Sequence, residues 1–303
     1  MTPLEVAIAR VPTLREREYQ ATRLAGLTNV NYLVDCGDER FVVRLPGDGT
    51  SEYIDRAVES VAAANAARAG VNAPVEYFDP TDGLMVTRYI DGAATMSAEG
   101  FQDLAAVARA GIAFRLLHDR SDLFAVDFRL SAMIDEYKAL LAAKGAQLPS
   151  GYDAAVRRAG EALRVLATQP AALVACHCDP LCENFLDTGD RMYIIEYEYS
   201  VNNDPMWDLG DLSVEGEFGR EQDAVLLRAY FGGDPPPDQA GRMVAYKALC
   251  DVLWTLWGLI QHVNDNPAED FEAYARRRLT RGFDLMESSA FADALVAIES
   301  ARS

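Results

Sequence analysis

Residues 177–198 read HCDPLCENFLDTGDRMYIIEYE, and the arrangement of polar side chains in this stretch decides the fold. Transfer of a phosphoryl group from ATP needs a carboxylate that accepts a proton from the attacking hydroxyl, and oxygen ligands that hold Mg²⁺ against the phosphates. Asp179 can be this base, and Asn184 and Glu196 can be the ligands. The turn sequence at residues 187–190 predicts a hairpin, whose open end would place Asn184 beside Glu196.

Before this stretch, the sequence predicts a small sheet with one helix. Two apolar, β-branched runs are separated by Gly37-Asp38, a hairpin signal, and two later runs flank the turn sequence at residues 80–83, Pro-Thr-Asp-Gly. A segment rich in Ala, Glu and Arg, without Gly or Pro, lies between the two pairs and favours a helix. The expected strands cover residues 30–35, 40–45, 75–78 and 84–89, with a further strand before residue 26, and the expected helix covers residues 53–68.

After residue 92 the pattern changes to long helical segments. Helices are expected over residues 97–117, 131–144 and 152–168, short extended pieces between residues 173 and 196, and helices again in the remainder. We therefore predict an α+β fold with two lobes. The first, residues 1–91, is a small antiparallel-sheet lobe that includes a connector near residues 87–92, and the second, residues 92–303, is larger and mainly helical.

The composition argues against several classes of partner. The 303 residues carry a formal net charge of −19, which disfavours nucleic acids and anionic lipid surfaces and modestly favours a cationic substrate. We find no window of about 18 apolar residues and no N-terminal pattern typical of a secretion signal, so we predict no membrane-spanning helix. We expect a cytoplasmic protein without nucleic-acid or membrane partners.

The five cysteines are Cys36, Cys176, Cys178, Cys182 and Cys250. An odd number without an export signal favours free thiols in a reducing compartment. The three that lie together could bind a metal, but thiolate zinc sites usually draw two ligand pairs from separated segments, and the other two cysteines stand alone. Small buried thiols are the favoured interpretation.

The central stretch resembles a known family. His177, Asp179 and Asn184 match the H-x-D-x-x-x-x-N loop of the aminoglycoside phosphotransferase and choline kinase superfamily, a branch of the protein-kinase-like fold. Residues 195–200, IEYEYS, are similar to the I-D-F/W-E-Y-S element of choline and ethanolamine kinases, and residues 204–209, DPMWDL, continue the similarity. The resemblance covers most of the chain and implies the two-lobed protein-kinase-like fold.

The resemblance implies a role for each of these positions. Asp179 resembles the catalytic base, Asn184 a magnesium ligand, and His177 a residue that braces the loop. Asp208 resembles the buried carboxylate that accepts backbone amide hydrogens from the catalytic loop. Most relatives have Asp where this chain has Glu196, and Mg²⁺ tolerates little error in its octahedral geometry. Either the longer side chain holds the metal in a shifted or bidentate way, or activity is weakened.

A loop that closes over phosphates needs backbone amides free of bulky side chains, together with hydroxyl or amide donors. Gly26, Thr28 and Asn29 meet this need, and their segment resembles the G-L-T-N loop of choline kinases. A simple β-turn would have the same sequence pattern. The loop therefore gains its meaning from the catalytic stretch rather than by itself.

Four further residues are candidates for binding ATP. Arg44 resembles the cation that contacts the α- and β-phosphates in the family, and its guanidinium can donate two hydrogen bonds to phosphate oxygens. Glu59 matches the acid that pairs with this cation. The alternatives are a solvated strand end for Arg44 and a surface helix position for Glu59. Thr87 and Tyr89 lie in the connector, whose backbone would meet adenine.

The acceptor site is expected near the C-terminus. Trp254 and Trp257, spaced i, i+3, share a helix face, and aromatic faces attract a trimethylammonium group by about 2 kcal/mol when it is desolvated. With Gln261 they resemble the W-x-x-W-x-x-x-Q helix of choline kinases. Tyr274, which precedes a basic run, and Glu215, an acid near the substrate head, complete the resemblance. The alternative for the tryptophan pair is core packing.

The sequence therefore predicts a kinase that uses ATP and Mg²⁺ to phosphorylate the hydroxyl of choline or a similar amino alcohol, with ethanolamine as the nearest substitute. A kinase for an aminoglycoside, thiamine or a sugar is an alternative within the same fold. A pseudokinase-like binding protein is another alternative, because of Glu196. His118 and His262 have no evident nucleophile partner and are expected to cap or pack helices. The assembly allowed for is a homodimer.

Overall fold

The computed structural model describes residues 1–24, 29–47 and 54–301, which form two compact units. Unit 1 comprises Met1–Val126 and Val174–Asn202, and unit 2 comprises Asp127–Leu173 and Asn203–Ser303. Each unit is therefore built from two separate segments of the chain. The predicted boundary at residues 91 and 92 divides the chain by function, and it stays a prediction.

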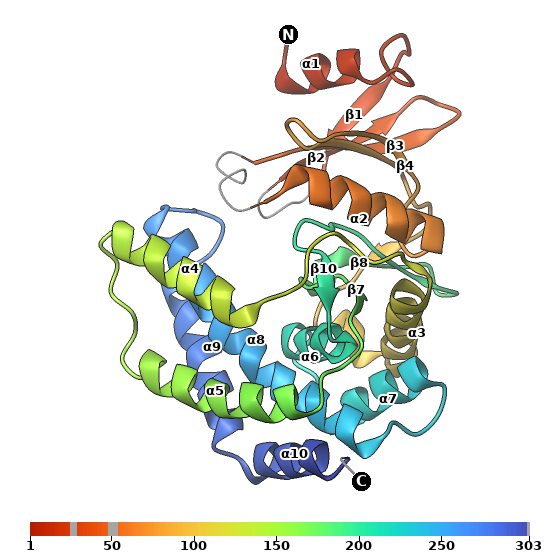
Figure 1. The fold of residues 1–303 in the computed structure, drawn as a ribbon. Helices are drawn as coiled ribbons and strands as arrows, with labels where there is room; N and C mark the ends of the chain where they lie inside the picture. Colours follow the sequence, from red (N-terminus) through yellow and green to blue (C-terminus); the bar gives the residue numbers. More distant parts are fainter. Residues whose placement is uncertain (25–28, 48–53, 302–303) are drawn as a thin grey trace. The chain divides into compact units, whose positions relative to one another are not determined.

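The main sheet of unit 1 has five antiparallel strands in the order β1-β2-β3-β5-β4 (Figure 1). The predicted strands at residues 30–35 and 40–45 agree with β2 and β3, and the two later strands agree to within one residue. The predicted small antiparallel sheet is confirmed. The strands are β1 (Gln20–Arg23), β2 (Val30–Asp35), β3 (Arg40–Leu45), β4 (Val75–Asp79) and β5 (Leu84–Arg88).

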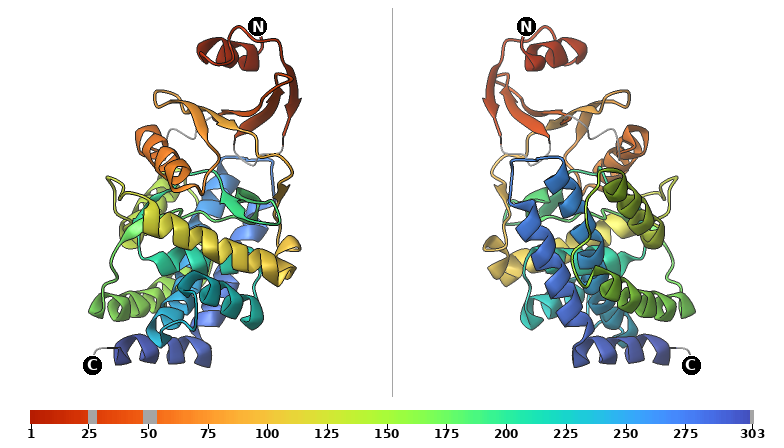
Figure 2. Two further views of the ribbon diagram at one scale, coloured as in Figure 1. Left: turned by 90° about the vertical axis from the view of Figure 1, so that its right-hand side faces the viewer. Right: turned by 90° about the vertical axis from the view of Figure 1, so that its left-hand side faces the viewer.

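Helix α1 (Pro3–Arg10) packs against this sheet and was not predicted from the sequence (Figures 1 and 2). Its N-terminus forms a capping box, in which the Thr2 side chain accepts from the Glu5 amide and the Glu5 carboxylate accepts from the Thr2 amide. Ile8 and its apolar neighbours share a buried core with Phe41 of β3. The Thr-Pro-x-Glu start was the signal that could have identified this helix.

The remainder of unit 1 carries the catalytic stretch. Helix α2 (Arg56–Ala69) begins after Asp55, whose side chain accepts hydrogen bonds from the amides of Ala57 and Val58. The helix predicted over residues 97–117 is instead a 3-10 turn, η2 (Gly100–Gln102), followed by α3 (Leu104–Arg120), because Asp103 caps the new helix. The other elements are β6 (Ala94–Thr95), β7 (Val174–Cys176), η3 (Cys182–Asn184), β8 (Phe185–Asp187), β9 (Met192–Ile194) and β10 (Val201–Asn203).

Unit 2 is mainly helical, as the sequence predicted. Its longest helix, α8, packs against α4, α5, α6, α9 and α10 (Figures 1 and 2). The helices are α4 (Leu130–Ala143), α5 (Tyr152–Thr168), α6 (Pro205–Glu215), α7 (Arg220–Phe231), α8 (Pro237–Val263), α9 (Phe271–Met286) and α10 (Ser289–Ser300). Sequence analysis missed the short strand β10, which precedes α6 and pairs with β7.

Helix α8 is long and apolar enough to cross a membrane by length and composition, which corrects our prediction that no such window exists. Its most apolar 18-residue window is 83 % buried inside the structure. Burial of this kind is typical of the core helix of a globular unit, and one such helix is weak support for a membrane span.

Candidate functional site

The predicted catalytic loop lies in unit 1 between β7 and β8. His177 is fully buried, and its Nε2 atom lies 2.9 Å from the carbonyl oxygen of Ile195. The Nδ1 atom accepts a hydrogen bond from the Asp179 amide at 3.3 Å, so Nε2 carries the proton and donates it to Ile195. Both ring nitrogens thus bond to the backbone, one within the loop and one at Ile195, and the bracing role of this histidine stays a prediction.

The loop is closed a second time by Asn184. Its side-chain Nδ2 donates to the carbonyl oxygen of Asp179 at 2.9 Å, and its own carbonyl oxygen accepts from the Ile195 amide at 2.9 Å. Strands β8 and β9 pair in the register Phe185 with Ile194, as the predicted hairpin requires. Asn184 therefore lies at the open end of the hairpin, beside the residue that precedes Glu196. The Asp179 side chain is half-buried.

Glu196 follows β9 in an unusual backbone conformation. Its φ angle is +64°, in the left-handed region, which a residue with a Cβ adopts at a conformational cost. The Oε2 atom of Glu196 accepts a hydrogen bond from Nη1 of Arg44 at 2.8 Å, and the side chain keeps about one fifth of its surface exposed. The structure thus joins a predicted metal ligand to a predicted phosphate ligand, 152 residues apart in the sequence.

Arg44 lies at the centre of a buried charged cluster rather than at a solvated strand end. The side chain is 1 % exposed, and its Nη2 atom lies 2.5 Å from Oε1 of Glu59 and donates to the carbonyl oxygen of Gly83 at 3.1 Å. Glu59, in the first turn of α2, is as deeply buried. The pairing of Arg44 with Glu59 is therefore present in the structure as the resemblance implied.

Two further residues complete this cluster and were missed by sequence reasoning. Arg56 donates from Nη1 to Glu59 at 2.6 Å and to Glu198 at 2.7 Å, and Glu198 also accepts from Nδ2 of Asn29 at 3.0 Å. We call Arg44, Arg56, Glu59, Glu196 and Glu198 the charged cluster. Glu198 belongs to the quoted IEYEYS stretch, so its position there could have indicated a place in the site. No sequence pattern indicated Arg56.

The charged cluster contains three carboxylates and two guanidinium groups. Burial by itself lowers the pKa of Arg44, but Glu196 and Glu59 outweigh it, and the net shift is upward, so Arg44 stays charged. Burial raises the pKa of Glu196 above its ordinary value, although Arg44 opposes the shift. Removing a charge from this cluster would leave its partner buried and uncompensated.

The other predicted nucleotide residues are distributed as follows. Gly26 and Thr28 lie outside the described residues. Asn29 is buried, and its Oδ1 accepts from the Gly47 amide at 3.2 Å. Thr87 is buried in β5, and the Tyr89 amide continues the sheet by donating to the carbonyl oxygen of Arg40 at 3.0 Å.

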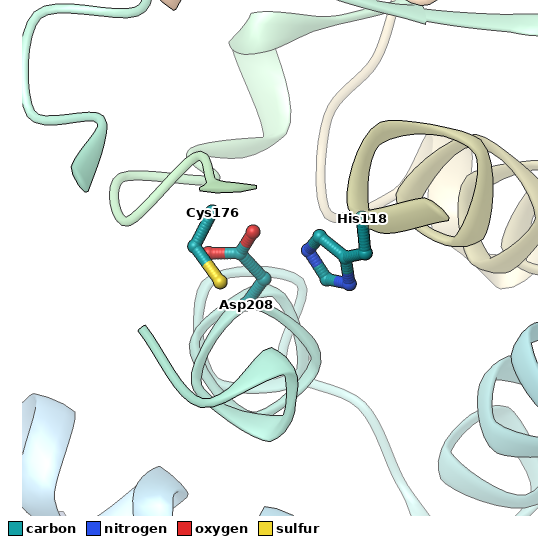
Figure 3. Close-up of side chains that lie close together, drawn as sticks. All are labelled: His118, Cys176 and Asp208. Atoms are coloured by element: carbon teal, nitrogen blue, oxygen red, sulfur yellow. The ribbon is translucent and has the colours of Figure 1, made fainter. Parts of the chain in front are cut away.

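Asp208, the predicted buried carboxylate, lies on α6 of unit 2 and is fully buried (Figure 3). Figure 3 also shows two buried residues of unit 1, His118 of α3 and Cys176 of β7, whose ligand atoms lie within 4.8 Å of each other. The His118 ring stacks on Phe114, with ring centroids 5.8 Å apart. His118 thus packs its helix, as expected.

Unit 2 brings the predicted acceptor aromatics together. The rings of Trp254 and Trp257 meet edge to face with centroids 6.3 Å apart, and Trp257 meets Tyr274 at 5.8 Å and Phe271 at 5.6 Å. We call these four residues the aromatic cluster. Phe271 was not predicted. Trp254 is almost fully buried, whereas Trp257 and Tyr274 are partly exposed. Trp254 therefore packs as core, whereas the rings of Trp257 and Tyr274 reach the surface.

The predicted acid Glu215 does not stand free. It forms an ion pair with Arg278, whose guanidinium carbon lies 4.8 Å from the centre of the Tyr274 ring. Glu215 and Tyr274 line a cavity of about 710 Å³, but four arginines of α9 line it too. Gln261 is buried and accepts from Asn266 through Oε1 at 3.0 Å, while its Nε2 has no hydrogen-bond partner among the described residues.

Comparison with known proteins decides the family. A model described as "Phosphotransferase enzyme family" matches residues 20–240, which is more than two thirds of the chain. The chain belongs to this family. The expected family and the expected kinase-like fold are confirmed, and the chain is a phosphotransferase. A similar solved structure is that of LicA in complex with AMP.

Three relatives of this phosphotransferase are informative. A choline/ethanolamine kinase family protein from Mesorhizobium loti is 51 % identical, with a TM-score of 0.89 over 98 % of each chain. The choline kinase LicA from Streptococcus pneumoniae is 26 % identical, with a TM-score of 0.79 over 94 % of this chain and 99 % of its own. Protein LicA of Haemophilus influenzae Rd is 30 % identical over 86 % of this chain and 99 % of its own length.

Proposed function

We propose that this phosphotransferase transfers the γ-phosphoryl group of ATP to the hydroxyl of choline or a related amino alcohol. The observation that supports the proposal most is the joint presence of a braced H-x-D-x-x-x-x-N loop in unit 1 and an aromatic cluster with buried carboxylates in unit 2. The similar structures include a choline/ethanolamine kinase family protein and the choline kinase LicA, which supports the same substrate class. We place the reaction in the cytoplasm and allow for a homodimer.

The catalytic chemistry that we propose follows from the fixed loop. Asp179 accepts a hydrogen bond from the acceptor hydroxyl and takes its proton as the oxygen attacks the γ-phosphorus, because a hydroxyl is a weak nucleophile until it is deprotonated. The bond from the γ-phosphorus to the β,γ-bridging oxygen breaks, and ADP leaves with its electron pair. His177 and Asn184 do no chemistry on the substrate. They hold the backbone of Asp179 from two sides, through its amide and its carbonyl oxygen.

Asn184 and Glu196 fit a magnesium ion by the chemistry of their donors. The Asn184 amide hydrogen bonds to Asp179 through Nδ2, which leaves its Oδ1 as a potential ligand, and Glu196 offers a carboxylate at the same open end of the hairpin. When bound, Mg²⁺ would neutralise charge on the β- and γ-phosphates. The longer side chain of Glu196 also reaches Arg44, so the same carboxylate serves two cations.

Arg44, Asn29, Thr87 and Tyr89, with Gly26 and Thr28, are the residues that we propose for binding ATP. The guanidinium of Arg44 is engaged along its Nη edge by carboxylates and one carbonyl. A phosphate oxygen could replace Glu196 at Nη1, while Glu59 and Gly83 keep hold of Nη2. Glu59 would then anchor the cation, and Glu196 would be the partner that is exchanged.

The test is an ATP-coupled assay with choline, ethanolamine and an aminoglycoside, together with the Asp179→Asn variant. We expect turnover with choline and a loss of kcat of about 10²- to 10⁴-fold in the variant, with ATP binding retained. No phosphorylation of any amino alcohol by the unmodified protein would overturn the assignment.

Two alternatives have specific support. Ethanolamine is favoured by the carboxylates beside the aromatic cluster, because a primary ammonium needs hydrogen-bond acceptors. A weakly active or pseudokinase-like protein is favoured by Glu196 and its contact with Arg44. Normal turnover of the unmodified protein would eliminate the second alternative, and the ratio of kcat/KM for the two amines would decide the first.

A further inference from the structure

Among the residues that the structure describes, one carboxylate beside the aromatic cluster forms no ion pair. Glu215 and Asp251 are both paired with arginines of α9. Asp211 of α6, 1 % exposed, has no Lys or Arg within ion-pair distance among the residues that the structure describes. Both of its oxygens lie 3.1 Å from Nε1 of Trp254, which donates to them. A buried carboxylate of this kind must be neutralised by a proton or by a cation from outside the chain.

The surroundings of Asp211 favour the proton when no ligand is present. Burial raises its pKa well above the ordinary value, Glu215 raises it further, and Arg278 opposes the shift. The thiol of Cys250 is a second hydrogen-bonding neighbour. The charged and titratable groups around Asp211 are Asp208 and Glu215 of α6, Cys250 of α8, and Tyr274 and Arg278 of α9.

The hydrogen bond from Trp254 connects this charge to the aromatic cluster. An indole whose N–H points at a carboxylate has more electron density on its ring, and a richer ring attracts a cation more strongly. The Trp254 ring in turn meets Trp257, the partly exposed ring of the pair. Trp257 differs in one respect, since its own Nε1 is buried without a hydrogen-bond partner among the described residues.

We propose that Asp211 is a positioning residue that makes the aromatic cluster select a positively charged ligand, by polarising and anchoring the indole of Trp254. The ligand class is a small quaternary or primary ammonium, and this choice rests on the proposed function. A ligand ammonium stabilises the ionised carboxylate, so its binding releases the proton held by Asp211. Affinity for the ammonium therefore increases as pH rises through the pKa of Asp211 in the free protein.

The experiment compares choline with 3,3-dimethyl-1-butanol, its uncharged carbon isostere, by calorimetry on the full chain. For Asp211→Asn, which keeps an oxygen acceptor for the Trp254 N–H, we expect the Kd of choline to rise about tenfold, equivalent to about 1.4 kcal/mol. The Kd of the isostere should be unchanged. Equal losses for both ligands, or no loss for either, would overturn the proposal.

Two tryptophan variants provide a matched control. Trp254→Phe removes the N–H that reaches Asp211, and it should reduce the preference for choline over the isostere by the same factor as Asp211→Asn. The double variant of Trp254→Phe with Asp211→Asn should show no further reduction. Trp207→Phe removes a buried N–H that has no hydrogen-bond partner among the described residues and lies outside the aromatic cluster, and it should keep the ratio of the two Kd values. If Asp211→Asn does not fold, Trp254→Phe still decides the question, because unchanged discrimination in that variant contradicts the role of the hydrogen bond.

Proton release is a readout that does not depend on turnover. Choline binding, measured in two buffers of different ionisation enthalpy, should release protons in the unmodified protein and none in Asp211→Asn. Tetramethylammonium serves as a probe that cannot be phosphorylated. If the probe binds with the same dependence on Asp211 while no amino alcohol is phosphorylated, the proposed function fails and the role of Asp211 stands. If choline is phosphorylated but its binding releases no proton, the proposed function stands and the role of Asp211 fails.

Discussion

The charged cluster of unit 1 and the aromatic cluster of unit 2 handle buried charge in opposite ways. In the charged cluster, both guanidinium groups contact carboxylates at 2.5 to 2.8 Å. Beside the aromatic cluster, Asp211 contacts an indole N–H and a thiol. Both cations of the first cluster are already paired with carboxylates of the protein, so a nucleotide has to compete for them. The second favours a ligand that brings its own positive charge.

Arg44→Met gives the largest change in stability. It leaves Glu59 and Glu196 buried without their main cation, and we expect the free energy of unfolding to fall by about 3 to 5 kcal/mol. Urea denaturation measures this loss. Arg44→Met with Glu59→Gln should regain part of it, because the second change removes an uncompensated charge. A loss below about 1 kcal/mol would mean that the cluster is not self-neutralised as the contacts indicate.

Trp257→Ala tests the ligand side of the comparison. The variant removes a partly exposed ring of the aromatic cluster, and we expect the KM for choline to rise about 30-fold, since a desolvated cation–π contact contributes about 2 kcal/mol. The kcat should change little. Trp207→Phe, at a tryptophan that packs on Phe128 and Tyr246 elsewhere in unit 2, is the control and should leave this KM unchanged. An unchanged KM in Trp257→Ala would favour an aminoglycoside or sugar as the acceptor.

Glu196→Asp sharpens the role of the exchanged carboxylate. The shorter side chain should lose its 2.8 Å contact with Arg44 and resemble the usual metal ligand of the family. We expect the Mg²⁺ concentration for half-maximal activity to fall several-fold, because the ion no longer competes with a guanidinium. Steady-state rates over a magnesium titration measure this. Ample and identical activity of the unmodified protein and of Glu196→Asp would reject the pseudokinase-like alternative. The same result would also reject a competition between Mg²⁺ and Arg44 for Glu196.

Asp79→Asn gives the smallest effect, because its ion pair with Arg10 lies near the surface. Hydrogen bonds from Thr81, and then Arg10, lower the pKa of Asp79 to about 2. A lowered pKa stabilises the fold above about pH 4, and this stability is lost as the pH falls towards 2. We expect the variant to be less stable by about 1 kcal/mol or less at pH 7. Denaturation at pH 2, where Asp79 is about half protonated in the folded state, should show a smaller difference, and an undiminished difference there would contradict the assignment.

Local patterns predicted much of the fold. The strands β2 and β3 and the helix α5 lie where alternation and helical periodicity put them, because their turn and cap residues act over a few positions. The capping box that starts α1 is also a local sequence pattern, and the sequence analysis overlooked it. The prediction of one helix over residues 97–117 was wrong because we overlooked a second local signal. Asp103 caps a new helix inside an apolar run that is otherwise compatible with a continuous helix.

By itself, the sequence determined the hairpin that joins Asn184 to the strand preceding Glu196, because a turn of fixed length sets the register of the strands beside it. Only the tertiary structure decided which charges meet. Arg56 and Glu198 are 142 residues apart, and Asp211 and Trp254 are 43 residues apart. Burial and pairing set the charge state of each group, and both depend on neighbours that the linear order of residues does not specify.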